Sequence, residues 1–232
     1  MRGNALCALG CGVVFALTVG ANSSLGAINR FSTRAAFNAA AVTINANEDF
    51  ASFTEDAPFR TSTVAANGFT LSQEGRDDGF RNQVDVPPFI FMNVGNGSNH
   101  ATMYVNFPES TLVATNVRIS FPVAASAFGA DFYNVGGGEG VVLDVIVNDA
   151  VAATFSVNTG FVGVVSAGGE RIDSVLLRAA TLDPGTGGEG FEMDNAAVRF
   201  VPDPATLTSL LPLTAFARGR RRVRAIRSIY TP

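Results

Sequence analysis

Hydrophobic and polar residues alternate with a period of two along much of the middle of the chain. In the segment 116–121, for example, Val117, Ile119 and Phe121 fall on one side and polar residues on the other. Such alternation is typical of a β-strand with one face in a hydrophobic core. The pattern predicts strands at 44–53, 69–73, 89–94, 102–107, 116–121, 127–132, 141–147, 151–157, 161–166, 171–179 and 191–200.

Short strands separated by turn-forming residues indicate an all-β domain. About ten such strands lie within 44–200, and Gly, Asn, Asp and Pro fill the intervals between them. The pair Asn148-Asp149 between two strands predicts a tight hairpin turn. The sequence shows no repeat at a solenoid period and no second domain. We therefore expect one antiparallel β-sandwich over residues 28–200.

One segment, 30–41 (RFSTRAAFNAAA), departs from the strand pattern. Its alanines favour a helix, and Ser32 or Thr33 can cap the N-terminus of that helix. The residues expected to anchor the helix on the domain are Phe31, Ala35 and Phe37. We expect one short N-terminal helix beside the sandwich.

The net charge of −4 conceals an uneven distribution of charge along the chain. Six of the 16 arginines lie in 218–227, whereas 28–200 contains 9 Arg against 19 Asp and Glu, a net charge of −10. An acidic body argues against binding to nucleic acid, because phosphates require a basic surface. It fits cation binding or plain solubility. Both cysteines, Cys7 and Cys11, fall in the first 11 residues, so the rest of the chain lacks thiols for disulfides, zinc or catalysis.

The N-terminal segment has the pattern of a secretory signal peptide. Arg2 supplies one positive charge, and 5–21 is uncharged and largely apolar. Small residues suited to cleavage follow, and we favour Ala27 as the cleavage point. Residues 1–27 are therefore expected to be a signal peptide, with an uncleaved membrane anchor as the alternative.

The composition changes sharply after residue 200. Two prolines in the stretch VPDPAT (201–206) interrupt the preceding strand. An uncharged, mostly apolar stretch occupies 207–217, and a cluster of arginines follows it at 218–222. The residues that carry this pattern are Pro202, Asp203, Pro204, Arg218, Arg220, Arg221 and Arg222.

This order of motif, apolar stretch and basic cluster resembles the PEP-CTERM sorting signal of exported bacterial proteins, with Asp203 in place of the usual Glu. The resemblance implies that the arginines halt export at the inner face of the membrane, where basic residues normally stay. It also implies that an exosortase-type protease removes the tail, 201–232. The apolar stretch has 11 residues, against about 20 needed to span a bilayer. We expect only transient membrane association; the alternative is a disordered tail or a small amphipathic appendage.

Parts of the middle resemble the β-sandwich that often precedes such tails, which looks like a jelly-roll carbohydrate-binding module. The matching stretches are 33–37, 127–132, 161–166 and 190–195. In modules of this type a structural calcium commonly ties the first strand to the last. The resemblance implies that the calcium ligands here would be Glu48, Asp49, Asp194 and Asn195. Carboxylate and carbonyl oxygens are the ligands that calcium prefers. The alternative is that Glu48 and Asp194 are solvated or pair with Arg199.

Catalytic chemistry has little support in the sequence. The single histidine, His100, begins a strand and is expected on the surface, not beside a nucleophile. Glu48, Asp131 and Glu192 could provide a carboxylate pair for glycoside hydrolysis, but any acidic domain contains such pairs. We therefore expect that the protein is not an enzyme.

Together these patterns predict an exported protein of the bacterial cell surface, outer envelope or extracellular matrix, with a structural or adhesive role. The alternative is a calcium-dependent carbohydrate-binding module for extracellular polysaccharide. Because the chain has no Trp, Tyr104 or Tyr133 would have to stack on the sugar. A glycoside-active enzyme is the more distant alternative.

Overall fold

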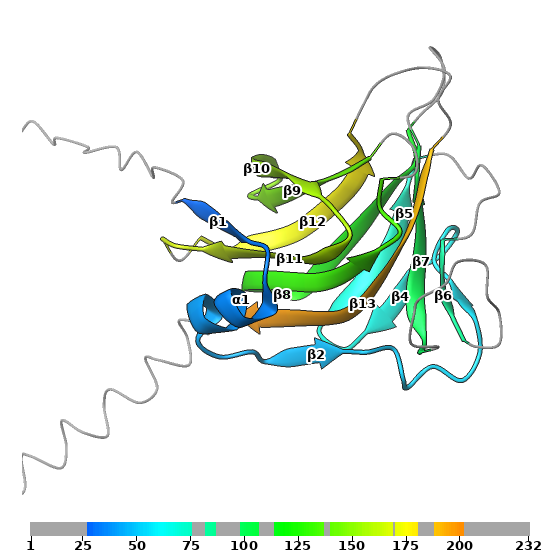
Figure 1. The fold of residues 1–232 in the computed structure, drawn as a ribbon, viewed down its shortest axis with the longest axis horizontal. Helices are drawn as coiled ribbons and strands as arrows, with labels where there is room; N and C mark the ends of the chain where they lie inside the picture. Colours follow the sequence, from blue (N-terminus) through cyan, green and yellow to red (C-terminus); the bar gives the residue numbers. More distant parts are fainter. Residues whose placement is uncertain are drawn as a thin grey trace, which may run out of the picture.

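Figure 1 shows the fold in a computed structural model, which describes residues 27–75, 82–86, 98–106, 114–136, 140–168, 170–180 and 188–201. Strands hold 64% of these residues and helix 6%, so the predicted all-β class with one short helix is confirmed. The predicted strand at 89–94 and the sorting residues from Pro202 to Arg222 lie outside the described residues, as do residues 1–26. Within the described ranges no helix has the length and apolar character needed to cross a membrane.

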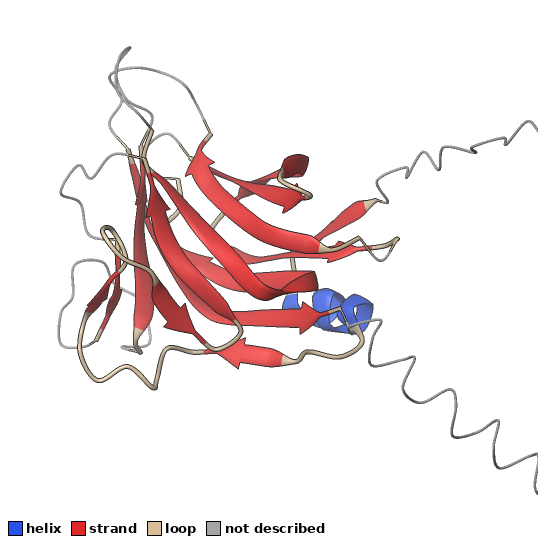
Figure 2. Cartoon of the chain, turned by 180° about the vertical axis from the view of Figure 1, so that it is seen from behind, coloured by secondary structure: helices blue, strands red, loops and turns tan. Residues whose placement is uncertain are grey.

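The elements follow one another along the chain as thirteen strands and one helix in the described residues. They are β1 (Ile28–Phe31), α1 (Arg34–Ala41), β2 (Ala46–Glu48), β3 (Ala57–Pro58), β4 (Val64–Ala66), β5 (Phe69–Glu74), β6 (Gln83–Asp85), β7 (His100–Val105), β8 (Asn116–Tyr133), β9 (Val141–Val147), β10 (Ala150–Val157), β11 (Gly160–Ser166), β12 (Ile172–Ala179) and β13 (Glu189–Phe200). Figure 2 shows that strands form nearly all of the body and that the single helix lies at one end of it.

The 18-residue strand β8 joins the two layers of the sandwich. Its first half, around Ile119, pairs with β5 and β12, and its second half, around Phe128, pairs with β11 and β13. One layer therefore has the strand order β4-β5-β8-β12-β9-β10, and the other has β1-β11-β8-β13-β7-β6-β3. Strand β2 pairs with the last part of β13. All of these pairings are antiparallel.

The sequence predicted a break between two strands at 122–126, and the structure has continuous strand there. The positions of β8 that face the core between the layers are odd-numbered from Val117 to Ala125 and even-numbered from Phe128 to Phe132. Between Ala125 and Ala127 the strand contains one residue more than its partner β13, which is a β-bulge. Such a bulge reverses which positions face the core. One bent strand therefore has the alternation of two separate ones.

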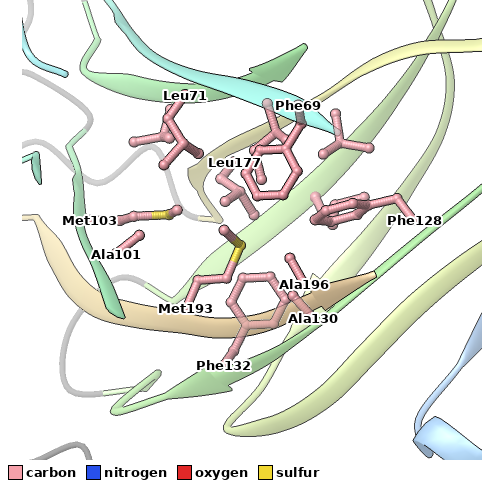
Figure 3. Close-up of a cluster of buried hydrophobic side chains, with 14 of the residues drawn as sticks. Phe69, Leu71, Ala101, Met103, Phe128, Ala130, Phe132, Leu177, Met193 and Ala196 are labelled. Carbon is pink, nitrogen blue, oxygen red and sulfur yellow. The ribbon is translucent and has the colours of Figure 1, made fainter. Parts of the chain in front are cut away.

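The hydrophobic core lies between the two layers. Figure 3 shows Phe69 and Leu71 from β5 on one side and Phe128, Phe132 and Met193 from β8 and β13 on the other, pointing toward one another. The rings of Phe69 and Phe128 meet edge to face, with centroids 6.4 Å apart. Edge-to-face contacts of this kind add about 0.5–1.5 kcal/mol to the free energy gained by burying the rings.

Two local predictions about turns and caps can be compared with the structure. Asn148 and Asp149 have φ of 50° and 59° and connect β9 to β10, so the predicted tight hairpin is confirmed. The helix begins at Arg34, later than predicted, because the preceding residues form β1 and pair with β11. Thr33 is the cap, and its Oγ1 accepts a hydrogen bond from the Ala36 amide at 3.3 Å.

As predicted, Phe37 anchors the helix on the sandwich. It packs on the outer face of the second layer, the one with the strand order β1-β11-β8-β13-β7-β6-β3. Its side chain is fully buried, and its ring centroid lies 5.3 Å from that of Phe161. Gly129 and Gly163 pair across β8 and β11 beneath the helix, and a Cβ on Gly163 would lie 2.6 Å from the Phe37 ring. The two glycines therefore leave the space that the ring fills. The predicted anchor Ala35 is exposed instead.

Candidate functional site

A bulge in β13 decides which of its side chains face outward. Asn195 has a φ of 50°, and the pairing with β8 shifts register between Asp194 and Ala197. Before the bulge Met193 packs in the core, and after it Ala197 packs against α1 on the opposite face. Because side chains alternate along a strand, Glu192 and Asp194 face outward on the side of the helix.

Polar residues cross this outer face in two rows, with neighbouring strands contributing residues at matched register. In one row the paired residues are Gln83, Thr102, Glu192 and Tyr133. In the other row the paired residues are Asp85 with His100 and Asp194 with Asp131. The strands β6, β7, β13 and β8 thus gather carboxylates from distant parts of the sequence. Asp131 belongs to one grouping and Asp85 and Glu192 to another, and the two groupings differ in their surroundings; Asp194 belongs to neither.

The first grouping is a polar cleft of about 450 Å³ where α1, β2, β8 and β13 meet, which we call the Arg34 cleft. The residues that line it are Arg34, Asn47, Glu48, Asp49, Asp131 and Asn195. The Arg34 guanidinium donates to Asp131 Oδ2 at 2.9 Å and to the Asn195 carbonyl at 2.6 Å. Its central carbon lies 4.7 Å from the centroid of the Phe161 ring. Charge-assisted bonds and the ring face both hold this cation in the cleft.

Glu48 connects the cleft to the loops around it. The pairing of β2 with β13 places Glu48 opposite Ala196, so this early strand does meet the last one. The Glu48 side chain is buried, and its two oxygens accept hydrogen bonds of 2.6 Å from the backbone amides of Phe50 and Asn67. Glu48 is therefore neither solvated nor paired with Arg199. Its carboxylate satisfies two loop amides.

The predicted calcium ligands are brought together only in part. Glu48, Asp49 and Asn195 line the cleft, but Asp194 does not. The Asp194 carboxylate accepts from the Asn195 amide at 2.6 Å and from the Ser98 hydroxyl at 3.1 Å. Among the residues that the structure describes, no three His, Cys, Asp or Glu side chains are already arranged to hold a metal ion. The four residues do not converge on one point, and calcium binding by them stays a prediction.

The second grouping, the Glu192 cluster, consists of Asp85, His100 and Glu192. Their exposed fractions are 2%, 6% and 0%. His100 Nε2 lies 3.8 Å from Glu192 Oε1 and 4.0 Å from Asp85 Oδ2. The prediction that His100 lies on the surface is wrong, because β7 is an inner strand with β6 on one side and β13 on the other.

In the Glu192 cluster, neighbouring groups fix one polar atom of His100 and one of Glu192. His100 Nδ1 lies 3.0 Å from the Ser98 carbonyl, which can only accept, so Nδ1 carries the proton. The Asn134 amide donates to Glu192 Oε2 at 3.2 Å. These contacts leave His100 Nε2 and Glu192 Oε1 facing each other across the centre of the cluster.

Both carboxylate oxygens of Asp85 accept hydrogen bonds, one from its own strand β6 and one from the neighbouring strand β7. The Gln83 amide donates to Asp85 Oδ1, and the Thr102 hydroxyl donates to Asp85 Oδ2. None of Gln83, Asp85 and Thr102 was a predicted site residue, because 83–85 is too short to be recognised as a strand from its sequence. The alternation of Gln83 and Asp85 about the buried Val84 is a signal of period two, but it covers only three residues.

Burial shapes the acid–base behaviour of this face. Burial raises the pKa of Glu192 above its usual range; His100 opposes the shift and the Asp85 charge adds to it. Burial likewise raises the pKa of Asp194. The pKa of Tyr133 is also raised, by burial and by the neighbouring carboxylates. The outer face therefore disfavours additional negative charge.

The carboxylates considered for glycoside hydrolysis do not share one site. Glu48 and Asp131 both line the Arg34 cleft, where backbone amides bind the first and Arg34 binds the second. Glu192 belongs to the other grouping. Tyr104, named above as a candidate for stacking on a sugar, has a hydroxyl that accepts a hydrogen bond from the Gly188 amide at 2.8 Å.

Comparison of the chain with known proteins gave no match to a family model, to a curated protein or to a solved structure.

Proposed function

We propose that the chain is an exported bacterial protein of the cell surface or extracellular matrix, sorted by a PEP-CTERM and exosortase-type system, with a structural or adhesive role. The observation that carries this proposal is the order of signals in the tail: Pro202-Asp203-Pro204, the apolar stretch 207–217 and the arginines of 218–222. Among the described residues, the first strand begins at Ile28 and the last strand ends at Phe200.

The arrangement of the first and last strands gives further support. Figures 1 and 2 show the start of β1 and the end of β13 at the same end of the sandwich, near α1. The chain therefore enters and leaves the folded body on one side. A tail held in a membrane during sorting would leave the opposite end, with β6 and β7, directed away from the lipid.

Cell fractionation and mass spectrometry in a host with an exosortase test the proposal. We expect the mature protein outside the cytoplasm, without residues 1–27 and without the tail. Replacing Arg218, Arg220, Arg221 and Arg222 by Ser should leave the tail uncleaved. The control variant carries Ser at Arg224 and Arg227, beyond the cluster, and should be processed normally. Full-length wild-type protein in the cytoplasm would contradict the proposal.

The Arg34 cleft supports a second candidate function, binding of extracellular polysaccharide. Its volume lies within the range of small-ligand sites, about 300–1,000 Å³. Amide, carboxylate and guanidinium groups of its lining can bond to sugar hydroxyls, and Tyr133 lies on the same outer face, two residues from Asp131. Arg34 already provides a cation in the cleft. This geometry therefore favours sugar binding without calcium over the calcium-dependent carbohydrate-binding module expected from the sequence.

Binding to immobilised bacterial polysaccharides, with calcium or with EDTA, tests this second function. The variant Asn47→Ala with Asp49→Ala removes two exposed polar groups of the cleft. We expect it to lose binding in both solutions. Glu55→Ala, an exposed carboxylate outside the cleft lining, is the matched control and should bind like wild type. Binding that the double variant retains would exclude the cleft as the sugar site.

A further inference from the structure

One buried oxygen of the Glu192 cluster has no hydrogen-bond partner. Glu192 Oε1 accepts no hydrogen bond from the described part of the chain, and the whole side chain is fully buried. An unpartnered carboxylate oxygen in a protein interior carries a large desolvation penalty. Other buried carboxylates of this protein show the contrast: both oxygens of Glu48 accept backbone amides, and Arg178 donates to both oxygens of Asp144. Glu192 is therefore the exception that needs a partner.

The group that faces Glu192 Oε1 is the nitrogen lone pair of His100. Because Nδ1 donates to the Ser98 carbonyl, Nε2 of the neutral ring has no proton. That lone pair lies 3.8 Å from Glu192 Oε1 and 4.0 Å from Asp85 Oδ2. These separations are too long for direct hydrogen bonds. His100 Nε2 thus lies close to one oxygen of each of two carboxylates, an arrangement that a cation would stabilise.

The hydrogen bonds behind the three groups are those of metal ligands. A histidine that binds a metal almost always donates its other ring nitrogen to a carbonyl or a carboxylate, and ligating carboxylates are themselves hydrogen-bonded. Here the Ser98 carbonyl holds His100 Nδ1, Asn134 holds Glu192 Oε2, and Asp85 is held at Oδ1 by Gln83 and at Oδ2 by Thr102. For His100 and Glu192 the anchored atom is the one that does not face the other ligands, whereas Asp85 Oδ2 accepts the Thr102 hydroxyl and has a second lone pair for an ion.

We propose that Asp85 Oδ2, His100 Nε2 and Glu192 Oε1 bind a divalent transition-metal ion of the zinc class. One imidazole and two carboxylates suit such an ion better than calcium, which prefers an all-oxygen set of six to eight ligands. Zinc bonds of about 2.0–2.2 Å in tetrahedral geometry separate neighbouring ligand atoms by about 3.3 Å. The three atoms must therefore approach by about half an ångström as the ion binds. Before this approach, no three such side chains are arranged to hold a metal ion among the described residues.

This site is separate from the one implied for calcium. None of its three ligands belongs to the set Glu48, Asp49, Asp194 and Asn195, and none lines the Arg34 cleft. The inference also does not depend on export or on sugar binding, because it rests only on the geometry of β6, β7 and β13. An ion here would tie together three strands of the second layer. Its role would be to stabilise that layer.

Calorimetric titration of the untagged full-length protein, first stripped with EDTA, tests the proposal with zinc chloride. We expect one ion per chain. Zinc at 100 times its dissociation constant should raise the melting midpoint by about 5–10 °C. Glu192→Gln keeps the size of the side chain and should abolish this response. Asp49→Asn, which alters a carboxylate of the Arg34 cleft, is the control and should respond like wild type. Asn134→Ala should weaken zinc binding by about 10- to 100-fold.

A second measurement uses the wild type alone and does not depend on how any variant folds. The chain has a single histidine, so its imidazole nitrogen resonances report only on His100. Direct coordination should shift the Nε2 resonance strongly on addition of zinc, while Nδ1 keeps its proton. A thermal response that Glu192→Gln retains would overturn the proposal. So would an unshifted Nε2 resonance in the presence of excess zinc.

Discussion

The Arg34 cleft and the Glu192 cluster lie on the same outer face, yet their negative charges are compensated differently. In the cleft, the Arg34 guanidinium bonds directly to Asp131 and to the Asn195 carbonyl. In the cluster, the basic side chain among the described residues is His100, and its Nε2 stays beyond hydrogen-bond distance of both carboxylates.

The difference indicates which of the two groupings responds to the pH and the ions of the solution. A guanidinium stays charged at any ordinary pH, so the charge of the Arg34 cleft is fixed by the covalent chain. The Glu192 cluster has no such group, and its charge depends on protons and ions that it takes from solution. The cleft is therefore expected to contribute a constant stability, whereas the cluster is expected to make stability depend on pH and on metal.

The largest expected effect on stability comes from detaching α1, the helix that carries Arg34. Phe37→Ala removes a fully buried ring and should lower the free energy of unfolding by about 3–5 kcal/mol, measured by urea denaturation. Asn38→Ala on the exposed side of the same helix is the control and should change it by less than about 0.5 kcal/mol. If the two groupings are independent, zinc binding survives Phe37→Ala. Loss of zinc binding in a folded variant would break the comparison.

The next effect separates the ion pair of the cleft from the helix itself. Arg34→Gln leaves the half-buried Asp131 carboxylate without its partner and should cost about 1–3 kcal/mol of stability. A double-mutant cycle with Asp131→Asn measures the coupling between the two side chains, expected at about 0.5–3 kcal/mol. A coupling energy near zero would show that the cation contributes by packing on Phe161 and not by its charge.

A smaller effect is the pH dependence of the stability that the Glu192 cluster contributes. Burial raises the pKa of Glu192 above its usual value of 4.5, so the folded state binds this proton more tightly than the unfolded state. The stability that this group contributes is fully present at low pH and is lost as pH rises from about 4.5 through the raised pKa. Metal-free Glu192→Gln should therefore have a flatter stability profile between pH 4 and pH 7.

Urea denaturation across that pH range measures this prediction. Asp49→Asn serves again as the control, since this exposed carboxylate belongs to the other grouping. Its profile should run parallel to that of the wild type. A Glu192→Gln profile that is also parallel would show that Glu192 does not titrate differently in the two states.

The smallest expected effect is that of calcium on the wild-type cleft. Because Arg34 holds the position of a cation there, calcium should raise the melting midpoint by less than about 2 °C. In the Arg34→Gln variant the same calcium concentration should raise the midpoint by more. A rise of about 5–10 °C in the wild type would instead support the calcium ligands expected from the sequence. Scanning calorimetry in calcium and in EDTA makes the comparison.

Sequence patterns were most informative where one strand face packs in the core. The strand at Val141–Val147 and the hairpin at Asn148-Asp149 were predicted as they occur, because alternation and turn residues are local signals. The helix cap at Thr33 is equally local. The prediction failed in β8, where a bulge shifts the alternation by one position, and in β6, which is too short to show a period.

Only parts of the Arg34 cleft and the Glu192 cluster could be predicted from the sequence. Pairing of an early strand with the last strand was expected, and it does place Glu48 beside β13. The expectation that Asp194 joins Glu48 did not foresee the bulge at Asn195, and Asp194 bonds to Ser98. His100 was assigned to the surface because its strand was not known to be an inner one.

The sequence by itself determined the all-β class, the acidic body and the turn and cap positions, since composition and residues a few positions apart decide these. Only the tertiary structure decided the strand order, the direction of each outer side chain and the meeting of Asp85, His100 and Glu192 from three strands. The physical reason is that pairing between distant strands and the bulges within them depend on how the whole core packs. A one-residue shift in register sends every following side chain to the other face.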